Sequence, residues 1–178
     1  MKIKTFLLVV LFNFIFNGVI MGNEKIQLGD IAPDFTVKNH RNEDFTLSGS
    51  KGKWIILYFY PKADTPGCTS QACSFRDAAT ILRDEGAEIY GISTDSVKSN
   101  AKFHEKYYLN FDLLSDVKGN ISKQYGVKMG IMNMSKRWTF LINPDQKITG
   151  IYPDVDPSKD ASTVLAKIKE INNMNETK

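Results

Sequence analysis

The chain has two cysteines, Cys68 and Cys73, which lie five residues apart in one short segment. An apolar run at residues 54–60 and a Thr-Pro-Gly turn precede Cys68, and an amphipathic stretch follows it. This order predicts that Cys68 stands where a helix begins. A helix N-terminus carries partial positive charge and free N–H donors, so it favours a thiolate over a thiol. Because the thiolate is the nucleophile, Cys68 is predicted to be reactive.

The spacing of the two cysteines restricts what they can do together. In a regular helix, residues five apart are rotated by ~140° and displaced by ~7.5 Å along the axis. A disulfide needs Cα atoms within roughly 7 Å and side chains that converge. A structural disulfide between Cys68 and Cys73 therefore requires a segment that is not helical, whereas a catalytic pair requires the first turn to unwind during the cycle. Both interpretations are open at this point.

Metal binding is not indicated by the sequence. A structural zinc site needs four ligands, most often Cys and His. The chain has two cysteines and two histidines, and His40 and His104 are far away in sequence and in no ligand pattern. We predict no metal and no cofactor, and expect both histidines to be surface residues.

Composition and charge are those of an ordinary globular protein with one domain. The formal net charge of the 178 residues is +3. Without residues 1–22, which contain Lys2 and Lys4, 21 basic residues face 20 acidic ones. This balance gives no support for nucleic-acid binding.

Residues 1–22 are predicted to be a signal peptide or an N-terminal anchor. Lys2 and Lys4 form a basic start, residues 6–16 are almost wholly apolar, and Gly22 supplies a small residue near the end. We therefore expect an exported protein, periplasmic or membrane-anchored and facing the periplasm, rather than a cytoplasmic one. Contact with a membrane is expected only if this segment stays uncleaved. In an exported protein two cysteines most often form a structural disulfide, so location alone favours a disulfide-stapled module.

Residues 23–178 are predicted to form a single α/β domain. The expected strands are 35–37, 45–47, 54–60, 87–93, 111–114, 137–143 and 147–152, and the expected helices are 68–85, 95–108, 118–125 and 158–172. A turn at residues 143–146 joins the last two strands as a hairpin, so the central β-sheet must be mixed. The predicted domain has helices flanking a mixed sheet and the reactive cysteine between a strand and a helix. This is the layout of the thioredoxin-like fold.

The segment around Cys68 resembles a known active-site signature. Pro61-x-x-x-Thr65-x-x-Cys68 is similar to the signature of the peroxiredoxins, and Thr65-Pro-Gly-Cys-Thr-x-Gln-Ala-Cys73 resembles their bacterioferritin-comigratory, or Q-type, subfamily. Weaker matches at residues 29–35, 91–95 and 137–142 follow in the family's order. The resemblance covers most of residues 26–171 and implies an atypical 2-Cys peroxiredoxin.

The resemblance implies a role for each site residue. Cys68 would be the peroxidatic nucleophile, which becomes a sulfenic acid, and Cys73 the resolving cysteine, which forms an intramolecular disulfide with it. Thr65 would place its hydroxyl between thiolate and peroxide. Arg137 would stabilise the thiolate and the developing negative charge. Pro61 would shield the pocket. Arg76 is the alternative cation, but eight residues of helix place it ~12 Å from Cys68 along the axis.

The leading hypothesis is therefore a thiol-dependent peroxidase that reduces hydrogen peroxide and organic hydroperoxides as a monomer. Its implied partner is a thioredoxin-like reductant, which the expected export would place in the periplasm or at the membrane. The alternatives are an exported thiol–disulfide oxidoreductase, which the four intervening residues disfavour, and a disulfide-stapled binding module. Residues 129–136, which include Met129, Met132 and Met134, depart from the family pattern, and we expect a loop near the active site there.

Overall fold

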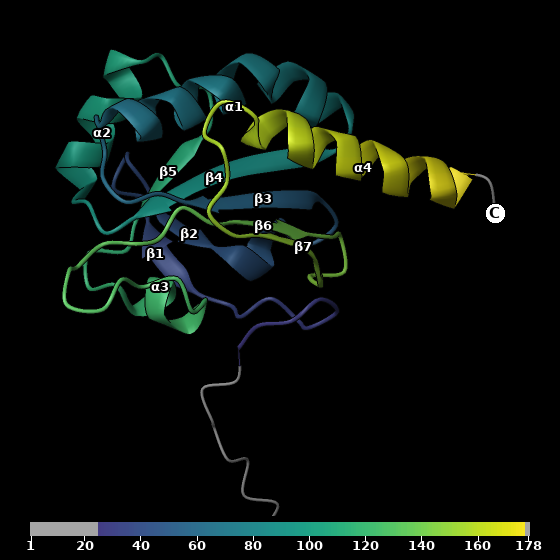
Figure 1. Cartoon of the computed structure of the whole chain (residues 1–178), viewed down its shortest axis with the longest axis horizontal. Coiled ribbons are helices and arrows are strands. Elements are labelled where there is room, and N and C mark those ends of the chain that lie inside the picture. Colours follow the sequence, from purple (N-terminus) through teal and green to yellow (C-terminus); the bar gives the residue numbers. More distant parts are fainter. Residues whose placement is uncertain (1–24, 177–178) are drawn as a thin grey trace, which may run out of the picture.

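A five-stranded sheet forms the centre of the molecule. The structure is a computed structural model that describes residues 25–176. The sheet has the order β5-β4-β3-β6-β7 (Figure 1), with bounds β3 Trp54–Phe59, β4 Ala87–Ser93, β5 Asp112–Ser115, β6 Thr139–Ile142 and β7 Ile148–Tyr152. β3, β4 and β5 are parallel, while β6 pairs antiparallel with both β3 and β7. The predicted α/β fold with a mixed central sheet, thioredoxin-like in layout, is confirmed.

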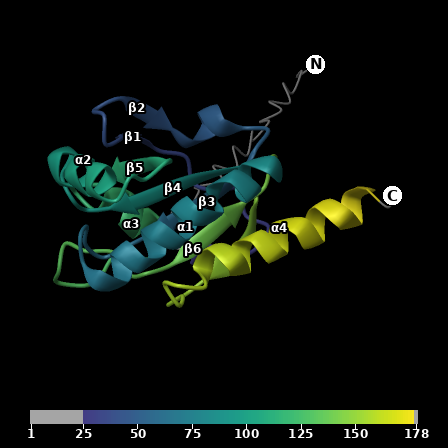
Figure 2. The same cartoon turned by 90° about the horizontal axis from the view of Figure 1, so that it is seen from above.

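The remaining elements cover the two faces of this sheet. They are the helices α1 Pro66–Asp84, α2 Val97–Lys106, α3 Asn120–Gln124 and α4 Asp160–Glu176, the 3-10 helix η1 Leu47–Ser50, and the antiparallel strands β1 Thr36–Lys38 and β2 Asp44–Thr46. Side chains of α1, α2 and α4 pack in the core on one face, and those of α3 and η1 in the core on the other. Figure 2 shows α1 and α4 side by side over the sheet.

The central strand β3 explains why the sheet is buried on both faces. All six of its residues are buried, as a continuous apolar run predicts. Ile56 and Tyr58 point toward the core under α1, whereas Ile55 and Leu57 point toward the core on the α3 side. This burial fixes the end of β3, from which the chain enters the loop before Cys68.

Several predicted bounds differ from those observed. α1 begins at Pro66, two residues before Cys68, because a proline fits the first helical position, where its missing N–H has no partner to lose. β6 begins at Thr139 rather than at Arg137, which precedes the strand. α4 begins at Asp160 and continues to Glu176, beyond the predicted end. Cys68 therefore lies within the first turn of α1, Arg137 lies just before β6, and Asp160 is the first residue of α4.

The predicted export segment, residues 1–22, lies outside the described residues. Within residues 25–176, no helix combines the length and the apolar character needed to cross a membrane.

His40 is not the surface residue that the sequence led us to expect. It is buried, and its ring stacks on that of His104 with centroids 3.8 Å apart. The backbone N–H of Leu113 donates a hydrogen bond to His40 Nδ1 (3.4 Å). The hairpin β1–β2 turns over the edge of the sheet, where Asn39 bridges to Leu114, and this long-range contact buries the ring.

The buried His40 predicts loss of stability in mild acid. Burial lowers its pKa to about 4, and the nearby His104 acts in the same direction, while Asp112 opposes it. Below the unfolded pKa of about 6.5, the unfolded chain takes up a proton that the folded chain refuses until about pH 4. The free energy of unfolding should therefore fall as pH drops through this window. Urea denaturation at several pH values measures it, and His40→Gln should flatten the profile; an equally steep profile in the variant would assign the loss to other groups.

Gly91 predicts a second, sharper effect on stability. This residue of β4 lies between Tyr58 of β3 and Leu113 of β5, and a Cβ there would stand 2.5 Å from the Tyr58 hydroxyl oxygen and 2.8 Å from Leu113 Cδ2. Tyr58 cannot retreat easily, because it is fully buried and stacked on Phe75. Gly91→Ala should lower the free energy of unfolding by about 1–3 kcal/mol, measured by urea denaturation. Gly49→Ala, whose Cβ would meet nothing within 4 Å, should keep the parent midpoint.

Candidate active site

Cys68 lies in the first turn of α1, directly beyond the carboxyl end of β3. The backbone N–H of Tyr60 donates to Ile92 of β4, which ties down the end of the strand (3.0 Å). Thr65 then stands in extended conformation at the N-cap, and Pro66 opens the helix. Cys68 is only 1% exposed. The sequence-based prediction of its place at a helix start is confirmed.

Arg137 reaches Cys68 from the segment just before β6, the strand next to β3 in the sheet. Because β6 runs antiparallel to β3, the residues just before β6 lie beside the loop that follows β3. The guanidinium Nη2 donates to Cys68 Sγ (3.4 Å), and Nη1 donates to Gln71 Oε1 (2.7 Å). A Cβ on Gly67 would stand 3.0 Å from Nη2, so the glycine leaves room for the guanidinium beside the first turn.

A buried polar network continues behind Arg137. Gln71 Nε2 donates to Asp160 Oδ2 (2.7 Å), and Thr139 Oγ1 donates to the same oxygen (2.6 Å). All three side chains are buried. Burial raises the pKa of the Asp160 carboxyl, while the hydrogen bonds from Thr139 and Gln71 and the positive charge of Arg137 act to lower it. Sequence reasoning assigned no role to these residues, although Gln71 lies within the quoted motif.

Thr65 and Pro61 lie in the loop between β3 and α1. The Thr65 hydroxyl donates to the carbonyl of Lys62 (2.9 Å) and makes no side-chain cap for α1. Asp95, which follows β4, holds this loop. Its Oδ2 accepts a hydrogen bond from the Ala63 N–H (2.8 Å), and its Oδ1 forms an ion pair with Lys62 Nζ (2.9 Å). The loop that precedes Cys68 is therefore held at the Ala63 backbone and at the Lys62 side chain.

Cys73 lies one and a half turns further along α1 and is half-buried; both cysteines are free. It lines an open groove of about 520 Å³ between α1 and α4, whose other walls include Ser70, Ser74 and Leu165. Arg76, the alternative cation, donates to Asp77 and to the carbonyl of Tyr107. Arg137 is thus the arginine that contacts Cys68.

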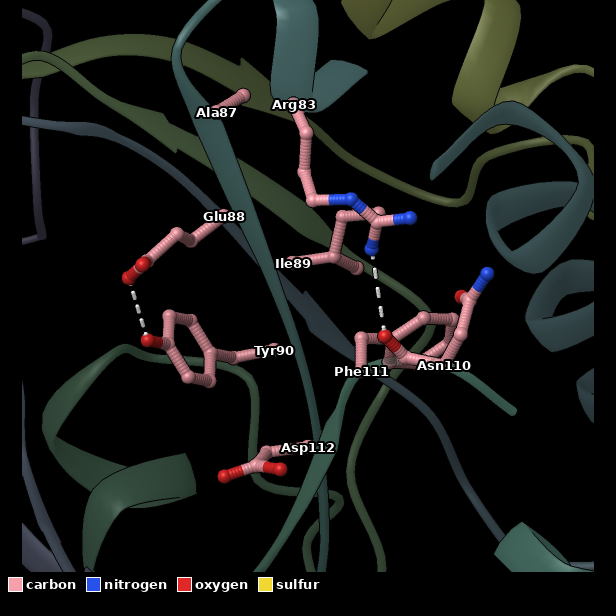
Figure 3. Close-up of a pocket in the computed structure, with 8 residues that line it drawn as sticks. All are labelled: Arg83, Ala87, Glu88, Ile89, Tyr90, Asn110, Phe111 and Asp112. Atoms are coloured by element: carbon pink, nitrogen blue, oxygen red, sulfur yellow. Dashed lines mark hydrogen bonds between the residues drawn. The ribbon is translucent and has the colours of Figure 1, made fainter. Parts of the chain in front are cut away.

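A second hollow, of about 260 Å³, lies elsewhere on the molecule (Figure 3). It is formed where β4 and β5 begin, with Arg83 donating to the carbonyl of Asn110 and Tyr90 donating to Glu88. Cys68 follows the carboxyl end of β3, which is parallel to β4. This hollow therefore lies at the other end of the sheet, and neither cysteine lines it.

The methionine-containing loop lies at the carboxyl ends of β4 and β5. The carbonyl of Asn133 accepts from the Thr94 hydroxyl, and its Nδ2 donates to the carbonyl of Val117 (3.0 Å). The loop therefore lies at the same end of the sheet as Cys68. Its hydrogen bonds through Asn133 are to the segments that follow β4 and β5. Within residues 25–176, no group of three His, Cys, Asp or Glu side chains is placed to hold a metal ion.

Comparison with known proteins gives consistent matches. Residues 28–151 match the model of the AhpC/TSA family. Peroxiredoxin Bcp of Escherichia coli is 40% identical over 151 residues, which cover 82% of this chain and 97% of that protein. The chloroplastic peroxiredoxin Q of Triticum aestivum is 36% identical over 86% of this chain and 71% of its own.

Solved structures agree with these matches. Peroxidoxin BcpB from Mycobacterium tuberculosis superposes with a TM-score of 0.77 at 36% identity, covering 82% of this chain and 98% of that one. The bacterioferritin comigratory protein of Xanthomonas campestris, described with alkyl peroxide reduction activity, gives a TM-score of 0.75 at 29% identity over 82% and 96%.

These relatives contradict the predicted export. The matched domain accounts for 97% of the E. coli protein, which leaves no room for a leader in that relative, and the wheat relative is a chloroplast protein. The expectation of a periplasmic or membrane-anchored protein is therefore wrong, and the reason for placing its reductant in the periplasm or at the membrane falls with it.

The site and the comparisons point to the same family. The site has a buried cysteine at a helix start and an arginine that donates a hydrogen bond to its sulfur, and the matches cover most of the described chain. The chain belongs to the AhpC/TSA family and is a peroxiredoxin of the Bcp/Q type, a thiol-dependent peroxidase.

Proposed function

We propose that Cys68 is the peroxidatic nucleophile of this enzyme. The observation that carries the proposal is the Arg137 guanidinium, which donates to Cys68 Sγ (3.4 Å) at the first turn of α1. The thiolate attacks one peroxide oxygen, an S–O bond forms as the O–O bond breaks, and the other oxygen leaves and takes up a proton to become water or an alcohol. Arg137 stabilises the charge that develops on the leaving oxygen.

Thr65 and Pro61 shape the place where the peroxide binds. Both lie in the fixed loop before α1, within seven residues of the nucleophile. On peroxide binding, the Thr65 hydroxyl turns from the Lys62 carbonyl toward the peroxide, and Pro61 excludes water from it. The alkyl peroxide reduction activity described for the Xanthomonas relative supports organic hydroperoxides as substrates. Hydrogen peroxide is part of the same proposal, because the attack on the O–O bond is the same.

Cys73 resolves the sulfenic acid within the same chain. Its thiol attacks the Cys68 sulfur, a disulfide forms and water leaves. Because α1 is regular from Pro66 to Asp84, the two cysteines stand ~7.5 Å apart along its axis, and the first turns must unwind. Both cysteines belong to one helix, so residues 23–178 act as a complete catalytic domain and a monomer suffices.

A thioredoxin-like dithiol protein restores the enzyme by thiol–disulfide exchange. The groove lined by Cys73 leaves that side of α1 open to such a partner. A binding module stabilised by a structural disulfide is not favoured, because both cysteines are free. A structural disulfide would also not require an arginine that donates a hydrogen bond to one of the two sulfurs. The oxidoreductase alternative is likewise not favoured, since the relatives are peroxiredoxins.

The cysteine roles predict different outcomes for two substitutions. Cys68→Ser should abolish peroxide consumption, because it removes the nucleophile. Cys73→Ser should complete one turnover and leave a sulfenic acid, which a dimedone-type probe and intact mass detect. The parent chain should gain an internal disulfide without forming a covalent dimer. Unchanged peroxide loss in Cys68→Ser would overturn the assignment, and turnover with a thioredoxin-like donor in Cys73→Ser would remove Cys73 from the cycle.

Arg137 should be required for the chemical step. Arg137→Lys keeps the charge but loses the planar fork that reaches Cys68 and Gln71 together. By analogy with the loss of one oxyanion donor, kcat/KM for hydrogen peroxide should fall about 10²–10³-fold, measured in the steady state with a dithiol donor. Arg83→Lys, in the same helix as Cys68 but bonded to Asn110, serves as the matched control. Parent-like activity of Arg137→Lys would show that the fork is dispensable.

A further inference from the structure

Gln71 occupies an unusual position, because it lies in α1 between the two cysteines and its polar side chain is fully buried. The two ends of its amide face opposite charges. Oε1 accepts from the cationic Arg137 (2.7 Å), and Nε2 donates to the carboxylate of Asp160 (2.7 Å). The amide therefore connects the arginine at the nucleophile with the beginning of α4.

Asp160 has a second hydrogen-bond partner outside α1. It is the first residue of α4 and 1% exposed, and Thr139 of β6 donates to the same Oδ2 that accepts from Gln71. Its Oδ1 is buried without a hydrogen-bond partner among the described residues. The carboxylate thus depends on Thr139 and Gln71 for its stabilisation. Asp160 also lies beyond residues 28–151, the segment that matches the family model.

Formation of the Cys68–Cys73 disulfide conflicts with this arrangement. The helix must unwind between the two cysteines, and Gln71 lies within the segment that moves. We propose that Gln71 and Asp160 form a latch that keeps the first turns of α1 folded with Arg137 facing Cys68, and that the latch opens before the disulfide forms. The inference rests on the proposed cysteine roles.

The latch sets how long the sulfenic acid remains at Cys68. While α1 is folded, the sulfenic acid can meet a second peroxide and be oxidised to sulfinic acid, whereas after unwinding Cys73 captures it. Hydrogen bonds to charged groups are stronger than those between neutral groups, so loss of one such bond should raise the open population about tenfold or more. Asp160 and Gln71 are positioning residues in this scheme, since neither contacts the peroxide.

A charge-relocation series in the full chain tests the proposal. Gln71→Glu sets a second carboxylate against Asp160, and Asp160→Ala removes the acceptor of Gln71 Nε2. The double variant Gln71→Glu/Asp160→Asn restores the link in reverse, because the new amide can donate to the new carboxylate. Thr163→Ala is the control, since this α4 side chain is exposed and its hydroxyl donates to the carbonyl of Lys159 just before the helix (2.9 Å), rather than to Gln71 or Asp160.

Each reduced protein is mixed with one equivalent of hydrogen peroxide, quenched and analysed by mass for sulfenic acid and disulfide over time. Both single variants should convert sulfenic acid to disulfide about tenfold faster than the parent, and with excess peroxide should accumulate less sulfinic acid. The double variant and the control should match the parent. Gln71→Glu and the double variant keep the test decisive if Asp160→Ala does not fold.

The outcomes separate the latch from the proposed function. If the parent forms sulfenic acid and disulfide but Gln71→Glu resolves at the parent rate, the latch is wrong and the cysteine roles stand. A single variant that resolves faster, with no rescue in the double variant, also overturns the latch, because the effect is then not the link. If the parent forms no sulfenic acid at Cys68, the proposed function fails and the latch fails with it.

Discussion

The contact between Arg137 and Cys68 is the interaction on which the arrangement of the active site depends. A guanidinium is a planar fork with donors in fixed directions, so it can reach Cys68 Sγ with one nitrogen and Gln71 with another only if three elements meet. β3 must deliver the loop, α1 must begin beside it, and β6 must run antiparallel to β3. The mixed sheet, rather than a wholly parallel one, makes this meeting possible.

The polar network is tolerated because the surrounding core is dense and aromatic. A buried carboxylate such as that of Asp160 is costly unless it is hydrogen-bonded, and only one of its oxygens has partners. Large apolar side chains on the same face of the sheet, among them Tyr58 and Phe75, supply the opposing stabilisation by burial. Burial of this apolar core therefore offsets the cost of a buried carboxylate near the place where chemistry is proposed.

Local patterns predicted what is local in the fold, and long-range contacts decided the rest. The buried run of β3 and the helix start at Cys68 follow from neighbouring residues, and Arg137 was reached by resemblance. Gln71 and Asp160 are 89 positions apart, so no spacing could pair them. The stacking of His40 on His104 could not be predicted for the same reason, because the two residues are distant in sequence. The export prediction rested on the short apolar stretch at residues 6–16. A stretch of that length and composition is not specific to a signal peptide.

The order of the site along the chain has a consequence for biosynthesis. Cys68, the proposed nucleophile, belongs to the first half of the sequence, whereas Arg137, Thr139 and Asp160 belong to its last third. Chains emerge from the ribosome with the N-terminal part first, so Cys68 is exposed to the cell before its arginine and its anchoring carboxylate exist. A nascent chain therefore carries Cys68 without these partners, and the proposed peroxide-reducing centre can assemble only when translation is nearly complete.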